Sequence, residues 1–357
     1  MPVIPSAGSG ISTFTQLLQA AKAHHCSDLH IRIGRVPYWR INGTLQAIAL
    51  PETDIATFWQ WADEVFSIEA IQQLQAGTAV STVVEYHFAK VAVQGYLTLD
   101  GAALSVRFLL RDLFTIDQLG IPTAIKQLCQ QPQGLIIVTG TSGSGTTTTL
   151  AALVNYINQI LPRHIVTIDE TAGYVYPKHQ ALIDQWLIGT HVTSTTQGIH
   201  RAMQTDSDVI VLSQLRDRST VDLALQAARS GNLVLACMAA DRAIVALQEL
   251  FSFYSSLEQD FIRLRLAQTL HAILAQHLVP TLNGQYKRAA IFDFLFTTDL
   301  VRQALRQGEL DNLSSLLQRP SSGLRSMLND LNRLLTEERI TAKTFADVSQ
   351  QLALEAT

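Results

Sequence analysis

The residues that most clearly indicate a binding chemistry are the glycines and threonines of residues 134–153, GLIIVTGTSGSGTTTTLAAL. Gly140, Gly145 and Thr147 have the spacing of a phosphate-binding loop, G-x-x-x-x-G-K-S/T, and Gly143 lies inside it. Glycines let the backbone turn tightly and direct several N–H groups inward. A helix that follows adds about half a positive charge at its N-terminus. The segment therefore predicts a cradle for phosphate.

One position of this cradle departs from the pattern, because Thr146 stands where lysine is expected. A hydroxyl group carries no charge to neutralise the β- and γ-phosphates, and a charged hydrogen bond is worth about 1.5–3 kcal/mol. We therefore expect weak binding of ATP or ADP, roughly ten- to over a hundredfold weaker than with lysine. Thr147 is expected to hold magnesium if a nucleotide binds. The cradle residues expected to bind are Gly140, Gly143, Ser144, Gly145, Thr146, Thr147 and Thr148.

An alternative interpretation of this segment is a linker rich in glycine, serine and threonine. The apolar run directly before it and the helical pattern directly after it argue against a linker. Fast phosphoryl transfer is not expected, because that reaction depends on positioning and charge neutralisation.

The elements that must position the cradle lie between residues 115 and 245, where apolar segments alternate with helical ones. Continuous apolar runs separated by helices predict a parallel sheet that is buried on both faces. The expected strands are at 134–140, 163–170, 207–214 and 231–239. Residues 246–357 are expected to be mostly helical, from the three- and four-residue apolar spacing within 263–278 and 324–335.

The N-terminal part of the chain predicts a smaller α+β domain. Its expected elements are a helix at 14–25, strands within 27–48, a helical stretch at 52–75 and strands within 83–110. Asn42-Gly43 and Asp100-Gly101 are typical hairpin turns. A chain of 357 residues is long enough for two domains, which we place at 1–112 and 113–357.

Composition excludes several classes of protein. A net charge of −4 gives no overall basic field for nucleic acid. The three cysteines are far apart and the histidines lack metal-ligand spacing, so neither a disulfide framework nor a zinc site is expected. No stretch approaches the ~20 apolar residues of a membrane span. We therefore expect a cytosolic protein.

Four segments together carry a resemblance to a known family. They are SDLHIRIGRVPYWRINGTL at 27–45, TIDQLGIP at 115–122, the cradle segment at 134–153 and SDVIVLSQLRDRSTVDLALQAARSGNLVLACMAA at 207–240. Over nearly the whole chain the sequence resembles the type IV pilus retraction motors, the PilT-like branch of the secretion ATPase superfamily.

The resemblance implies an α/β architecture, in which a PAS-like N-terminal domain precedes a RecA-like P-loop NTPase domain with a helical C-terminal region. It also implies a hexameric ring, ATP with magnesium, and a role in twitching motility. The implied location is cytoplasmic, at the inner-membrane base of the pilus machine, with a platform protein or a motor paralogue as partner. Arg302 and Arg306 lie in a segment that resembles a C-terminal helix motif of these motors, although a solvated helix face is an equal alternative.

The departures from this family concentrate in the chemistry. Ser213 and Gln214 stand where the Walker B region ends in glycine and glutamate, and glutamine neither attracts magnesium nor accepts a proton. Asp169 and Glu170 keep two acids in swapped order, and Gly173 replaces a later glutamate. Asp169 is one methylene shorter than the expected base, a displacement on the scale of ~1 Å that costs rate. Catalytic residues, if any, would be Asp169, Glu170 and Gln214.

Further positions implied by the resemblance are changed or reduced. Asn232 and Ala239 replace two histidines. In the N-terminal domain Arg107 fits one of the arginines expected to contact nucleotide, Lys90 lies near another, and Ala92 replaces a third. The alternatives are an ordinary sheet-surface arginine at 107, ordinary strand-end acids at 169 and 170, and a structural ion pair between Arg216 and Asp217.

Two functions from different classes follow. The first is a catalytically impaired or non-catalytic motor-family subunit that acts as a structural or regulatory partner. The second is a divergent, slow ATPase that uses Thr147, Asp169 and Asp208 around magnesium. Lys90 and Lys178 are candidates to replace the missing lysine, although nothing in their spacing recommends either. A weaker third is a sensor of another anion. The combined loss of charge at positions 146 and 214 favours the first.

Overall fold

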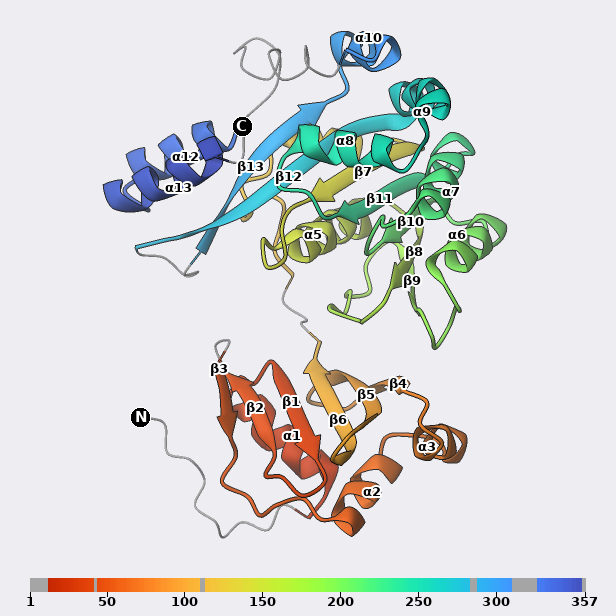
Figure 1. Cartoon of the computed structure of the whole chain (residues 1–357), viewed down its shortest axis with the longest axis vertical. Coiled ribbons are helices and arrows are strands. Elements are labelled where there is room, and N and C mark those ends of the chain that lie inside the picture. The colour runs from red at the N-terminus through yellow and green to blue at the C-terminus, as the bar shows by residue number, and fades with distance from the viewer. Residues whose placement is uncertain (1–11, 42–43, 110–112, 283–287, 310–325, 355–357) are drawn as a thin grey trace. The chain divides into compact units, whose positions relative to one another are not determined.

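The computed structural model describes residues 12–41, 44–109, 113–282, 288–309 and 326–354. The chain divides into two compact units (Figure 1). Unit 1 comprises Met1–Arg111 and Thr171–Val175, and unit 2 comprises Asp112–Glu170 and Tyr176–Thr357. The turn expected at Asn42-Gly43 lies outside the described residues.

Unit 1 is an antiparallel sheet of six strands in the order β3-β2-β1-β6-β5-β4. The strands are β1 (Asp28–Arg32), β2 (Tyr38–Ile41), β3 (Thr44–Ala47), β4 (Val80–Glu85), β5 (Lys90–Thr98) and β6 (Gly101–Phe108). Three helices, α1 (Phe14–Ala23), α2 (Ile55–Asp63) and α3 (Ile68–Gln75), contribute apolar side chains to the same core as the sheet. Unit 1 is therefore an α+β unit, and its assignment as PAS-like stays a prediction.

Two local details of unit 1 differ from expectation. The helical stretch at 52–75 is two helices. The first ends at Asp63, and Ser67 caps the second, since its hydroxyl accepts a hydrogen bond from the Ala70 N–H. The second hairpin turns at Leu99 and Asp100, since Thr98 pairs with Gly101. Gly101 is thus the first residue of β6, with φ of +125°, and the turn lies one residue earlier than expected.

Unit 2 is built on a seven-stranded sheet in the order β13-β12-β7-β11-β10-β8-β9 (Figure 1). The strands are β7 (Gly134–Thr139), β8 (His164–Asp169), β9 (Leu182–Leu187), β10 (Val209–Leu212), β11 (Leu233–Met238), β12 (Leu270–Pro280) and β13 (Arg288–Phe296). Neighbouring strands run parallel except at the β12–β13 pair. The four strands expected from apolar runs form as β7, β8, β10 and β11, with β7 between β11 and β12.

Helices cover both faces of this sheet. One face packs against α4 (Thr123–Leu128) and α5 (Thr146–Ile160). The other packs against α6 (Thr195–Gln204), α7 (Arg218–Arg229), α8 (Ala243–Ser252), α9 (Ser256–Thr269), α10 (Asp299–Gln307), α12 (Met327–Thr336) and α13 (Ala342–Leu354). Burial on both faces explains why the central parallel strands β7, β10 and β11 are apolar at nearly every position.

The expectation of a mostly helical region after residue 246 is wrong for residues 270–280 and 288–296. The segment that starts LHAILAQHL forms β12, and the segment that contains FDFLF forms β13. An apolar run that is buried on both faces has no period of two, so its spacing resembles that of a buried helix. Strand β9 was also not expected, and its half-buried side chains give it no apolar run.

No helix within the described residues is long and apolar enough to cross a membrane.

Candidate functional site

The glycine-rich segment connects the end of β7 to the start of α5. Gly143 and Gly145 have φ of +83° and +89°, a backbone conformation that glycine adopts without strain. A Cβ atom added at Gly140 would lie 2.6 Å from the carbonyl oxygen of Gln276. The loop therefore packs closely on β12, and its tight turn needs glycine for two separate reasons. At Gly143, by contrast, an added Cβ would meet nothing within 4 Å.

Thr146, at the lysine position, is directed to the neighbouring strand β11. Its side chain makes a hydrogen bond with the thiol of Cys237, the pKa of which burial raises to about 12. The same thiol lies within electrostatic range of Asp169 at the end of β8. At the position from which a lysine would extend to the phosphates, the structure thus has the Thr146 hydroxyl and the Cys237 thiol, both neutral, and the Asp169 carboxyl group.

Within the described ranges, Asp169 is a buried carboxyl group without a compensating cation. Its Oδ2 accepts a hydrogen bond of 2.8 Å from the Thr167 hydroxyl, which lowers its pKa, but burial outweighs this and raises the pKa to about 6. No ion pair joins Asp169 to any side chain in the part of the chain that the structure describes. A carboxyl group in this state is close to half-protonated near pH 6.

A second set of polar side chains lies where β8 and β10 end. Arg216 forms an ion pair with Glu170, and its Nη2 donates to Glu170 Oε2 at 3.1 Å. Its Nε also donates to Gln214 Oε1 at 2.6 Å. Arg216 therefore holds both the second acid of the Asp-Glu pair and the glutamine that stands at the Walker B glutamate position. Glu170 is exposed, so this ion pair is worth at most about 1 kcal/mol.

The expected ion pair between Arg216 and Asp217 is wrong. Asp217 instead caps helix α7, because its Oδ1 accepts from the Thr220 N–H at 2.9 Å. An aspartate directly before a helix satisfies one of the free N–H groups of the first turn. The neighbouring arginine is then left to pair across the strand ends with Glu170.

The proposed use of Asp208 around magnesium is also wrong. Asp208 precedes β10, and its Oδ2 accepts from the His164 N–H at the amino end of β8. Thr147 follows the carboxyl end of β7, so the four residues of β10 separate the two edges by about 13 Å. Asn232 lies at the same amino edge as Asp208 and donates to the Ser207 carbonyl.

The candidate residues of the N-terminal part lie in unit 1. Arg107 on β6 donates its Nε to Asp28 Oδ1 at 2.9 Å across the β1–β6 pair. Lys90 on β5 lies 4.0 Å from Glu85, and Ala92 is the register partner of Arg107. Within its unit Arg107 is thus a sheet-surface arginine with an acidic partner, and a contact with nucleotide stays a prediction.

The geometry suits a phosphate group better than a triphosphate with magnesium. The glycine conformations and the exposed Thr147 at the first turn of α5 provide a backbone cradle and one hydroxyl. Within the described ranges no group of three or more histidine, cysteine or acidic residues could hold a metal ion. A bound nucleotide would therefore contact backbone N–H groups and Thr147, without a lysine to neutralise it and without a carboxylate at position 214.

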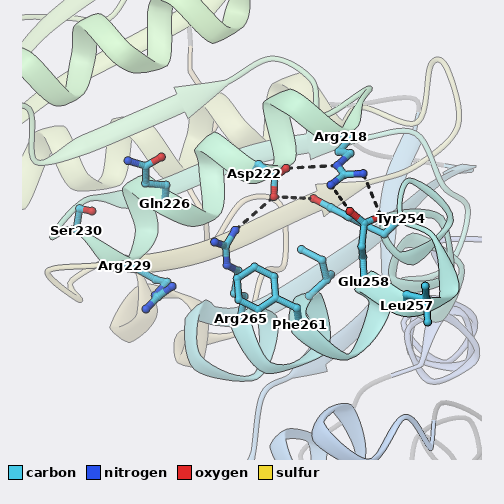
Figure 2. Close-up of a pocket in the computed structure, with 11 residues that line it drawn as sticks. Arg218, Asp222, Gln226, Arg229, Ser230, Tyr254, Leu257, Glu258, Phe261 and Arg265 are labelled. Atoms are coloured by element: carbon cyan, nitrogen blue, oxygen red, sulfur yellow. Dashed lines mark hydrogen bonds and ion pairs between the residues drawn. The ribbon is translucent and has the colours of Figure 1, made fainter.

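A separate groove lies on the surface between helices α7 and α9 (Figure 2). It has a volume of about 700 Å³, and Arg218 and Arg265 both pair with Asp222 within it. On α9, Leu257 is 94% exposed and Phe261 is 55% exposed. These two residues are four apart, so they lie on one outward helix face beside charged side chains. Such a surface is typical of contacts between proteins.

Sequence reasoning missed two residues beside the cradle, Cys237 and Gln276, and it missed the ion pair between Arg216 and Glu170. Cys237 stands at the carboxyl end of an apolar run, in the neighbouring parallel strand, which was a usable signal. Gln276 carried no signal, because its segment was interpreted as helical and a strand position beside β7 was not expected.

Comparison with known proteins connects the chain to secretion and pilus motors. The family model described as "Type II/IV secretion system protein" matches residues 7–321. The uncharacterized protein YggR of Escherichia coli K12 is 34% identical over 304 residues, which cover 85% of this chain and 92% of YggR. A twitching motility protein of Neisseria gonorrhoeae is 29% identical, covering 84% and 81% of the two chains. The crystal structure of the pilus retraction motor PilT with bound ADP has a TM-score of 0.84 at 27% identity, over 93% of this chain and 95% of PilT.

Proposed function

We propose, on the premise that this chain belongs to the type II/IV secretion system protein family and is PilT-like within it, that it is a non-catalytic motor subunit. It would act as a structural or regulatory partner in pilus retraction and twitching motility. The observation that carries this proposal is that positions 146 and 214, where the family pattern has lysine and glutamate, both hold neutral side chains. Thr146 is hydrogen-bonded to Cys237, and the Gln214 amide is held by Arg216.

The proposed assembly is a hexameric ring, formed by this chain alone or together with an active retraction ATPase paralogue. The location that fits is the cytoplasmic face of the inner membrane, against the platform protein of the pilus machine. The resemblance to pilus motors supports both statements. The exposed apolar face of α9 supports assembly, because burial of Leu257 and Phe261 against another subunit would remove their apolar surface from water.

The alternative is a divergent, slow ATPase. One observation favours it: burial raises the pKa of Asp169 to about 6, near the range in which a general base is effective. The glycine cradle would supply the phosphate contacts and Thr147 the magnesium contact. Neither supplies the charge that is missing at Thr146.

ATP hydrolysis by the purified chain is expected to stay at background. Thr146 supplies no charge to neutralise the transferred phosphoryl group, and Gln214 cannot accept a proton. The measurement is steady-state phosphate release with magnesium and ATP, compared with a mock preparation and with Thr147→Ala. Turnover that exceeds the mock preparation and disappears in Thr147→Ala would support the slow ATPase instead.

Phe261→Glu is expected to weaken assembly by tenfold or more, because it places a charge in the centre of an apolar contact. The measurement is size-exclusion chromatography with light scattering, for the chain alone and mixed with the active paralogue from the same cell. Leu182→Glu is the matched control, since Leu182 is also exposed, at 63%, but begins β9. A strict monomer that also fails to co-elute with the paralogue would contradict the subunit proposal.

A further inference from the structure

Gln276 on β12 contacts both sides of the phosphate loop. Its side-chain Nε2 donates to the Ser144 carbonyl at 2.7 Å, and its Oε1 accepts from the Thr149 hydroxyl. Ser144 belongs to the loop and Thr149 to the first turns of α5. Gln276 is 2% exposed, so no solvent replaces either hydrogen bond. One side chain therefore joins the loop, the helix that follows it and the strand beside it.

The surrounding packing leaves the amide a single orientation. A glutamine amide has donors only on nitrogen and acceptors only on oxygen. Here the nitrogen faces the Ser144 carbonyl, which can only accept, so exchange of the amide nitrogen and oxygen would place two acceptors against each other and break that bond. A Cβ at Gly145 would lie 2.8 Å from the Gln276 Nε2, and one at Gly140 would lie 2.6 Å from the Gln276 carbonyl. The glycines are thus packed on this residue along its length.

We propose that Gln276 is a positioning residue that holds the phosphate loop in its cradle conformation in the absence of any nucleotide. A loop with glycines at 140, 143 and 145 loses much conformational entropy when it is ordered. In this chain Thr146 provides no ammonium group to compensate that loss. The two buried hydrogen bonds of Gln276 supply the compensation, whether or not the site hydrolyses ATP.

Hydrogen exchange of the full-length chain tests this role. In Gln276→Met, which has similar length and no amide, exchange in residues 140–150 should accelerate at least tenfold. Val279→Ala is the matched control, because Val279 is a fully buried residue of the same strand that belongs to the core on the opposite face of the sheet. It should lower the protection of β12 without a selective effect on the loop.

Thr149 gives a second test that leaves Gln276 in place. Thr149→Val removes the donor to Oε1 and should also accelerate loop exchange, whereas Thr149→Ser keeps a hydroxyl and should preserve protection. The double variant Gln276→Met with Thr149→Val should add little to either single change. The proposal is overturned if loop exchange in Gln276→Met rises no more than in Val279→Ala, or if Thr149→Val and Thr149→Ser behave alike.

Discussion

Thr146→Lys is expected to raise the affinity for ADP and ATP by ten- to over a hundredfold. The change adds one charge-assisted hydrogen bond to the phosphates, which is worth about 1.5–3 kcal/mol. The cradle that must receive the phosphates is already formed, with Gly143 and Gly145 in their turn conformations. Titration calorimetry of the wild-type chain and the variant, with and without magnesium, measures the difference.

Thr146→Met is the control for this experiment, because it adds length without charge. A gain in affinity that Thr146→Met reproduces would assign the effect to packing and contradict the charge argument. Low-micromolar binding by the wild-type chain, unchanged in Thr146→Lys, would contradict it as well. Hydrolysis should require Gln214→Glu in addition, since tighter binding alone does not orient the attacking water.

Asp169→Asn is expected to stabilise the protein near pH 8 by about 2–3 kcal/mol. Burial raises the pKa of Asp169 to about 6, so the folded state binds this proton more tightly than the unfolded state does. The associated stability is fully present below the ordinary aspartate pKa and is lost as the pH rises through about 6. Asparagine resembles the protonated form in size and keeps an oxygen for the Thr167 hydroxyl.

The measurement is thermal or denaturant unfolding of wild type and Asp169→Asn at several pH values. At pH 8 the variant should melt about 6–10 °C higher, as expected for a unit of this size. The difference should vanish near pH 3, where Asp169 is protonated in both the folded and the unfolded state. An equal difference at both pH values, or a less stable variant at pH 8, would contradict an uncompensated carboxylate at this site.

The two substitutions should not be additive. Thr146 and Asp169 both act on Cys237, so an ammonium group introduced at position 146 would lie close to the Asp169 carboxylate. It would favour the ionised form and lower the pKa of Asp169. The stabilisation by Asp169→Asn at pH 8 should therefore shrink or reverse in the Thr146→Lys background.

The parallel part of the motor fold was predictable because its strands carry a direct sequence signal. Residues 134–140 and 231–239 are apolar at nearly every position and are separated by helical patterns, which only a doubly covered sheet explains. The family resemblance added the rest of the assignment to secretion motors, and the comparisons confirm it. The strands at 270–280 and 288–296 were missed because an apolar run alone does not distinguish a buried strand from a buried helix.

The site was predictable in composition but not in its contacts. The sequence shows directly that position 146 holds threonine instead of lysine and that position 214 holds glutamine instead of glutamate. The contact partners of these two side chains are not visible in the sequence, since Cys237 and Arg216 reach these residues only through strand order and helix capping. Asp208 was misplaced for the same reason: being close to an apolar run does not tell which end of the strand faces the cradle.

The attachment of the phosphate loop to β12 through Gln276 has a consequence for how this sequence can change over generations. The conformation of the phosphate loop depends on the residue at position 276, whereas ATP hydrolysis would depend on the residues at positions 146 and 214. A lineage that no longer needs hydrolysis can accept substitutions at 146 and 214 while purifying selection still acts on 276. Substitutions should therefore be tolerated less well at position 276 than at positions 146 and 214.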